Sequence, residues 1–162
     1  KYAEALRLKP DFHAAFGNWG AALSEHAKTK TGDEADRLFE EAGGKYAEAL
    51  RLKPDYHEAL SNWGTALLEH AKTKTREQAD GLLRDARKRL LEAERISPGS
   101  GAYNLACVEA REGKMWQAVQ WLQAAQMAGQ RLSRAKIESD NDFDRVRNHA
   151  EFVKFVESLT DN

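Results

Sequence analysis

The sequence predicts an all-α fold built as a stack of like helix pairs. Two observations predict it: much of the chain repeats itself almost unchanged, and each repeat carries apolar residues at helical spacing. Residues 1–42 and 45–86 share 29 identities in 42 positions, and Pro10, Pro54 and Pro98 stand 44 residues apart. Repeats of this kind bury a core only by stacking on their neighbours. No segment alternates apolar and polar residues over the length of a strand.

The repeat divides the chain into five parts. We expect a partial repeat at 1–10, two full repeats at 11–54 and 55–98, a shorter third repeat at 99–132 and a C-terminal capping segment at 133–162. Each repeat is expected to hold two helices, and a proline ends the second one. Four residue pairs match the capping box that begins a helix: Thr31 with Glu34, Asp55 with Glu58, Thr75 with Gln78, and Asn148 with Glu151.

These repeats resemble the tetratricopeptide repeat. The family places a large apolar residue before a small one in the first helix, and Trp19-Gly20, Trp63-Gly64 and Leu105-Ala106 match that pair. Its second helix is alanine-rich and stops at proline, as at Ala86, Leu90, Ala93 and Pro98. The resemblance covers roughly residues 1–129, and the tail resembles the segment that closes bacterial arrays of this family. It implies a right-handed superhelical solenoid of antiparallel helix pairs, with Trp19 and Trp63 in the core.

The first two repeats are longer than the family's usual period of about 34 residues. Ten additional residues lie near the turn between the two helices, so we expect both helices to be longer. The added turns would form a wall above the groove that the first helices line. This wall would carry Glu25, His26, Lys28, Glu69, His70 and Lys72. In the tail, Phe152, Val153, Phe155, Val156 and Leu159 form an apolar stripe that can cover the end of the stack.

Composition excludes several classes of function. The net charge of -1 argues against a nucleic-acid partner, and no apolar run is long enough for membrane insertion. Cys107 is the only cysteine, and the five histidines show no metal-binding spacing, so we expect neither a metal site nor a cofactor. The histidines are expected on helix surfaces. No catalytic motif is present, which predicts a protein that is not an enzyme. A single cysteine and no signal-peptide pattern favour a cytoplasmic over a secreted location.

The candidate binding residues follow from the resemblance, which places the residue before each large apolar position in the concave groove. That residue is an asparagine in every repeat, and its amide can pair with an extended peptide or can instead set the stacking of helices. Neighbouring positions on the same face complete the set. The predicted groove residues are Asn18, Ser61, Asn62, Thr65, Tyr103 and Asn104.

The sequence therefore predicts a non-catalytic scaffold that binds a protein or peptide partner in its groove. The alternative is a self-assembly module, because residues 1–11 match the end of a second helix and lack the rest of that repeat. An open apolar edge at Tyr2 and Leu6 would then pair with another copy and form a homodimer.

Overall fold

The computed structural model describes residues 13–159, and the regular secondary structure in this range is all helix, without strands. The all-α prediction is therefore confirmed for this part of the chain. The chain forms two compact units, and the boundary between them lies between Ile96 and Ser97. Tyr2 and Leu6 lie outside the described residues, so the edge predicted there stays a prediction. None of the described helices is both long and apolar enough to cross a membrane.

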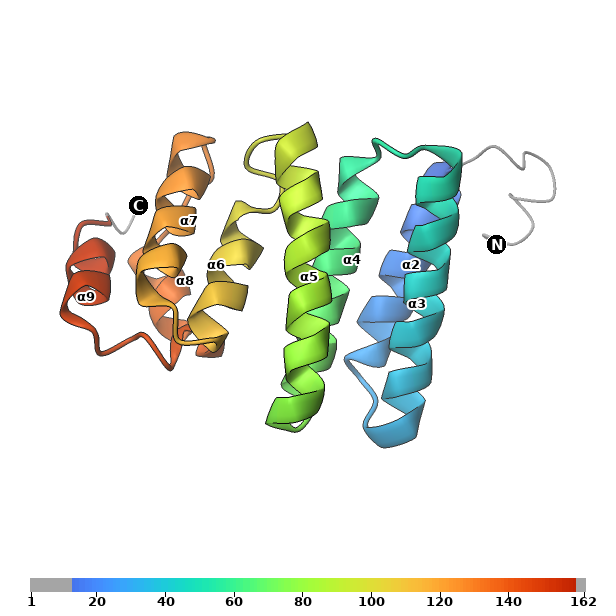
Figure 1. Cartoon of the computed structure of the whole chain (residues 1–162), viewed down its shortest axis with the longest axis horizontal. Helices are drawn as coiled ribbons and strands as arrows, with labels where there is room; N and C mark the ends of the chain where they lie inside the picture. The colour runs from blue at the N-terminus through green and yellow to red at the C-terminus, as the bar shows by residue number, and fades with distance from the viewer. Residues whose placement is uncertain (1–12, 160–162) are drawn as a thin grey trace. The chain divides into compact units, whose positions relative to one another are not determined.

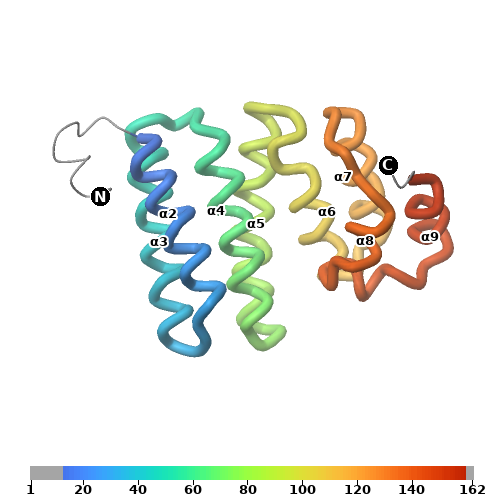
Figure 2. Tube along the Cα trace, turned by 180° about the vertical axis from the view of Figure 1, so that it is seen from behind, coloured from blue at the N-terminus to red at the C-terminus, as the bar shows by residue number. Residues whose placement is uncertain are grey.

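The first unit contains two helix pairs. Helices α2 (His13–Ala27) and α3 (Gly32–Leu52) form one pair, and α4 (His57–Lys72) and α5 (Arg76–Ile96) form the other. Each helix lies beside the next in the order of the chain, and α2 also contacts α4 (Figure 1, and from behind in Figure 2). The second unit holds α6 (Ala102–Arg111), α7 (Met115–Met127), α8 (Arg134–Ser139), the 3-10 helix η1 (Asn141–Phe143) and α9 (Ala150–Glu157).

The additional residues of the first two repeats lengthen their helices, as predicted. α2 and α3 have 15 and 21 residues, and α4 and α5 have 16 and 21. The third pair, α6 and α7, has only 10 and 13. The connections stay short, so the inserted residues form hydrogen-bonded helix rather than a long loop. The repeat boundaries and the superhelical path remain predictions.

Two of the four predicted capping boxes place the start of the helix wrongly. α4 begins after Tyr56, because the N–H groups of Ala59 and Leu60 donate to the carbonyl of Tyr56 at 3.1 and 3.2 Å. Asp55 therefore lies in the preceding turn. α9 likewise follows His149 instead of Asn148. Thr31 and Thr75 do precede α3 and α5. The Thr75 hydroxyl donates to the Gln78 side chain at 3.2 Å, whereas Thr31 makes no side-chain cap bond.

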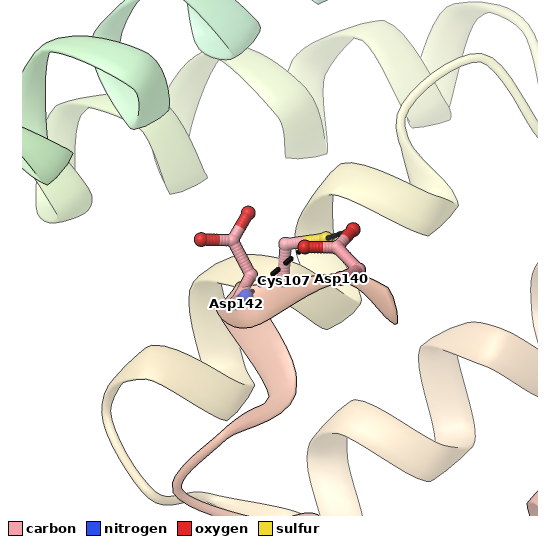
Figure 3. Close-up of side chains that lie close together, drawn as sticks. All are labelled: Cys107, Asp140 and Asp142. Carbon is pink, nitrogen blue, oxygen red and sulfur yellow. Dashed lines mark hydrogen bonds between the residues drawn. The ribbon is translucent and has the colours of Figure 1, made fainter. Parts of the chain in front are cut away.

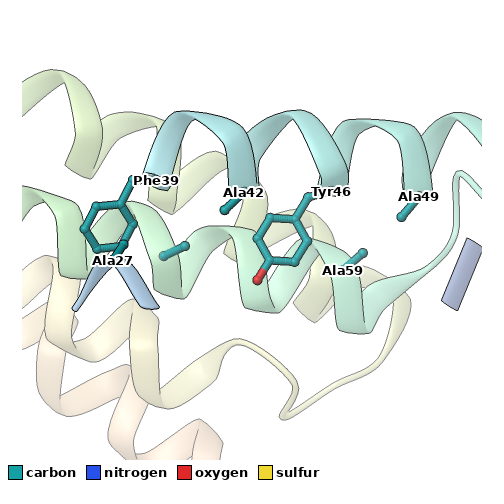
Figure 4. Close-up of a cluster of buried hydrophobic side chains, with 7 residues drawn as sticks. Ala27, Phe39, Ala42, Tyr46, Ala49 and Ala59 are labelled. Atoms are coloured by element: carbon teal, nitrogen blue, oxygen red, sulfur yellow. The ribbon is translucent and has the colours of Figure 1, made fainter. Parts of the chain in front are cut away.

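One side of α3 supplies the core of the first unit. Phe39, Ala42, Tyr46 and Ala49 follow at helical spacing along this side and are buried (Figure 4). Alanines on this side let the neighbouring helices come close to α3, and the two rings fill the remaining space.

Gly20 and Gly64, the small residues of the predicted large-small pairs, lie where the neighbouring helix leaves no room for a side chain. A Cβ atom at Gly20 would lie 2.8 Å from the Tyr46 ring, and one at Gly64 would lie 2.5 Å from Leu90 Cγ. Trp63 packs against the core cluster of the first unit but is not fully buried, and Trp19 is not part of that cluster, so the prediction of core positions is wrong for Trp19 and only partly right for Trp63. Both tryptophans are half-buried, because each lies one residue before the glycine that packs on the neighbouring helix and so points in another direction from the helix axis. Lys45 lies 3.9 Å over the Trp19 ring and Arg89 lies 4.0 Å over the Trp63 ring.

The second unit is built around α6, whose residues from Leu105 to Ala110 are all buried. α7 packs against α6 on one side, and η1 packs against it on another. Phe152, Phe155, Val156 and Leu159 of the predicted apolar stripe are buried, while Val153 is 38% exposed. The C-terminal segment thus contributes core side chains to this unit.

Candidate functional site

A pocket between α2 and α4 gathers part of the predicted site. Asn62 and Thr65 line it from α4, together with Ala66 and Glu69. Ala21, Ser24 and Glu25 line it from α2, Lys28 lines it from the turn that follows, and Phe39 and Tyr46 lie beneath. Asn18 and Ser61 are on the same two helices but do not line the pocket. Asn18 and Asn62 are both exposed, and Ser61 and Thr65 are half-buried.

Two aromatic rings form the floor of this pocket. The Tyr46 side chain is 1% exposed, and its hydroxyl lies 3.3 Å from the Ser24 hydroxyl, which itself donates to the carbonyl of Gly20 at 2.9 Å. Burial raises the pKa of Tyr46, so the floor is uncharged at physiological pH. Phe39 is 6% exposed and lies flat against the His70 ring, with ring centres 4.8 Å apart. The floor is therefore buried and largely apolar.

Charged side chains form the rim. Glu25 and Glu69 line the pocket at equivalent positions of two repeats, and each pairs with the lysine three residues later in the sequence. The Glu25–Lys28 distance is 2.6 Å and the Glu69–Lys72 distance is 2.8 Å. A second hollow continues past Phe39 and is lined by Lys28, Lys30, Glu69 and Lys72. Four of the six predicted wall residues thus surround these hollows.

His70 is not a surface residue, which corrects the prediction for it. It is 8% exposed, and its Nε2 lies 2.9 Å from Asp36 Oδ1 of α3. Lys74 also donates to the Asp36 carboxylate. These bonds join α3 of one repeat to the end of α4 in the next. The side chains of Lys74 and His70 hold the pKa of Asp36 below its usual value.

Replacing Asp36 should therefore reduce stability in a pH-dependent way. Asp36→Asn should lower the free energy of unfolding by about 1–3 kcal/mol at pH 7, since it weakens the bonds to a buried histidine. A carboxylate with a lowered pKa stabilises the folded state above its unfolded-state pKa, and this contribution disappears as the pH falls through its folded-state pKa. The free energy of unfolding, measured with urea, should therefore differ less between the unchanged protein and Asp36→Asn at about pH 3 than at pH 7.

The matched control is Asp80→Asn, since Asp80 is the equivalent residue of the next repeat and is exposed. It should change the free energy of unfolding by less than about 0.5 kcal/mol. If both variants lose the same free energy of unfolding at pH 7, the bonds of Asp36 to His70 and Lys74 do not contribute to stability.

In the second unit, the predicted groove residue Tyr103 contacts the C-terminal segment. Its hydroxyl donates to Asp140 Oδ2 at 2.8 Å, and its ring meets the Phe143 ring edge-on with centres 6.0 Å apart. Lys136 lies 4.0 Å from the centre of the same ring. Burial and the bond to Asp140 raise the pKa of Tyr103, so the hydroxyl stays protonated. Asn104, the next residue of α6, is half-buried.

Cys107, Asp140 and Asp142 lie close together (Figure 3), and Asp140 is the residue to which Tyr103 donates. The Asp140 Oδ2 atom is 3.9 Å from Cys107 Sγ and accepts the Tyr103 hydroxyl bond, while its Oδ1 atom accepts from the Asp142 N–H at 3.0 Å. Asp142 is 3% exposed and pairs with Arg111 at 3.1 Å. Since α6 supplies a partner for each carboxylate, this cluster joins the C-terminal segment to α6.

Sequence reasoning missed the floor of the pocket and the role of His70. A signal for the floor was present, because Phe39 and Tyr46 are two aromatic residues seven apart on one side of a predicted helix. The contact between His70 and Asp36 joins residues 34 positions apart. Nothing in the local pattern marks it.

Comparison with known protein families gives a match to the first part of the chain. The model described as "Plant specific mitochondrial import receptor subunit TOM20" matches residues 1–106, about two thirds of the chain. No curated protein matches the sequence. The family match supports a fold like that of tetratricopeptide proteins and a non-catalytic, protein-binding role. It also shows that the expected cytoplasmic location is wrong, since the family is a mitochondrial import receptor subunit.

Proposed function

The chain belongs to the family of plant-specific mitochondrial import receptor subunits TOM20, and from this membership we propose that it binds the targeting helix of proteins to be imported. The observation that carries the proposal is the pocket between α2 and α4, with its aromatic floor and its two glutamates. The binding mode would be an amphipathic helix in a groove of tetratricopeptide type.

The chemistry of the pocket suits such a ligand. Mitochondrial targeting segments are amphipathic, rich in arginine and poor in acidic residues. A leucine from their apolar side can enter the pocket between Ala21 and Ala66, above the buried ring of Phe39. Their arginines can reach Glu25 and Glu69. Each glutamate is already paired with the lysine three residues later, but exposed pairs of this kind contribute little stability, so a ligand arginine can compete.

The amide of Asn62 supplies the polar contact in this proposal. It is exposed at the pocket, where it offers two donors and an acceptor to a ligand backbone or side chain. Thr65 lines the pocket one turn further along α4. Asn18 and Ser61 lie on the same helices and would extend the contact. Tyr103 and Asn104 belong to the other unit and stay predicted groove residues.

A labelled peptide tests the proposal. We would use a synthetic amphipathic helix of about 15 residues with a leucine stripe and four arginines, and measure binding by fluorescence polarisation. Asn62→Ala with Glu69→Gln should weaken binding at least tenfold, about 1.4 kcal/mol, and leave the melting temperature nearly unchanged. Binding should also weaken as salt is added, because exposed charges are screened.

Two controls make the result specific. A peptide of the same composition with the leucines scattered should bind at least tenfold more weakly, since it lacks an apolar side. Asn148→Ala with Glu41→Gln changes the same residue types at exposed positions outside the pocket and should bind like the unchanged protein. If the pocket variant binds the amphipathic peptide as tightly as this control does, the ligand does not use the pocket.

A further inference from the structure

Helix α7 presents an exposed side without any charge. The sequence of Met115–Met127 contains no Asp, Glu, Lys or Arg, in a chain that is 31% charged. Trp116 is 60% exposed and Met127 is 89% exposed, and the exposed positions between them are glutamines. Exposed tryptophan and methionine together with a lack of charge are features of protein interfaces.

The exposed residues form a narrow stripe along the helix. Trp116, Gln120, Gln123 and Met127 follow at spacings of four, three and four, which places them on one side of α7. Gln117 and Gln126 flank this stripe. From Trp116 to Met127 the stripe is roughly 16 Å long at 1.5 Å per residue.

The stripe has the same kinds of residue at matching distances from its two ends: a large apolar residue at each end and a glutamine four residues further in. About a centre between Trp121 and Leu122, Trp116 corresponds to Met127, and Gln120 corresponds to Gln123. In a two-fold symmetric dimer the same surface meets itself, and two antiparallel helices bring corresponding positions opposite each other. Trp116 of one copy would then contact Met127 of the other, and the glutamine amides would meet as donors and acceptors.

We propose that this side of α7 is a self-association surface whose partner is a second copy of this chain, packed antiparallel about the centre of the helix. The lack of charge favours a second copy over a charged partner, because a charged side chain would lose water here and find no opposite charge. A single 13-residue helix offers less than the roughly 800 Å² per partner of a standard interface, so the dimer is weak.

Sedimentation equilibrium tests the surface. From low micromolar concentrations to about 1 mM, the mean mass should rise from that of a monomer towards that of a dimer. Trp116→Lys with Met127→Lys should remain a monomer throughout, with unchanged helicity by circular dichroism. The matched control is Leu91→Lys, since Leu91 is an exposed apolar residue of α5 at 42% exposure, and it should dimerise as the unchanged chain does.

Cross-linking tests the antiparallel register. A mixture of Trp116→Cys and Met127→Cys chains should cross-link through a short bismaleimide. Either variant alone should not, since its two cysteines would be at least roughly 16 Å apart along the helix axis. Cys107 is 1% exposed and stays out of reach of the reagent.

Three results would overturn the proposal. They are a monomer at all concentrations, a dimer that survives the double lysine substitution, and cross-linking of Trp116→Cys alone as efficient as that of the mixture. The second result would place the dimer on another surface, such as the edge predicted at Tyr2 and Leu6.

Discussion

Replacing Tyr46 with alanine should lower the free energy of unfolding by about 3–5 kcal/mol. The ring is buried on the core side of α3 and contacts Gly20 of α2, while Trp63 of α4 lies with its ring centre 6.4 Å away. Its removal leaves a cavity at the meeting point of three helices, and glycine at position 20 has no side chain with which to fill it. Urea unfolding followed by circular dichroism measures the loss.

Tyr46→Phe is the control for this prediction. It keeps the ring and removes only the hydroxyl contact with Ser24 at 3.3 Å, so it should cost no more than about 1.5 kcal/mol. A loss below about 1 kcal/mol for Tyr46→Ala would mean that the helices close the space, and the ring would then not set their separation.

Adding one methyl group at Gly64 should destabilise the protein by about 1–3 kcal/mol. The new Cβ atom would lie 2.5 Å from Leu90 Cγ, 2.8 Å from Leu90 Cδ2 and 3.2 Å from the carbonyl oxygen of Ala86. Leu90 is fully buried and the carbonyl is part of the backbone of α5, so neither can move aside easily. The helices α4 and α5 would have to separate, and thermal unfolding would report the loss as a lower melting temperature.

Gly81→Ala provides a contrast of opposite sign. Gly81 also lies inside a helix, but a Cβ atom there meets nothing within 4 Å. Alanine is the better helix former, so this variant should gain about 0.5–1 kcal/mol of stability. If both substitutions stabilise the protein, then α4 and α5 do not approach each other as closely as the structure shows.

The sequence predicted the helix pairs well because their determinants are local and occur more than once. The same three signals recur from repeat to repeat: helical spacing of apolar residues, a small residue after each tryptophan, and a proline at the end of the second helix. A pattern that arose by chance in one repeat would not recur in the next. The two tryptophans show the limit of this reasoning. Their place in the family's large-small pair predicted a buried position, but a nearby cation covers each ring, and such a contact depends on the neighbouring helix.

The candidate site was predictable only in part. Asn62 and Thr65 were identified because position in a repeat determines which side of α4 a residue occupies. Tyr103 holds the same repeat position as Ser61, yet its hydroxyl bonds to Asp140 of the C-terminal segment, which has no counterpart in the earlier repeats. The bond between His70 and Asp36 was equally invisible, because it depends on how one helix pair packs on another.

The contact between Asp36, His70 and Lys74 has a consequence for how such an array can grow by gene duplication. Two of its three residues have equivalents in the first repeat, since His26 and Lys30 stand 44 positions before His70 and Lys74, and Asp36 belongs to the first repeat itself. A tandem copy of residues 11–54 would therefore bring a new His26 and Lys30 to the old Asp36, and the polar contact would form again at the new junction. The tight packing of Gly20 on Tyr46 lies within one repeat and would be copied whole. An in-frame duplication of 44 residues would thus supply the residues for the polar contact between the old and the new repeat. The number of repeats could then change without new substitutions at that interface.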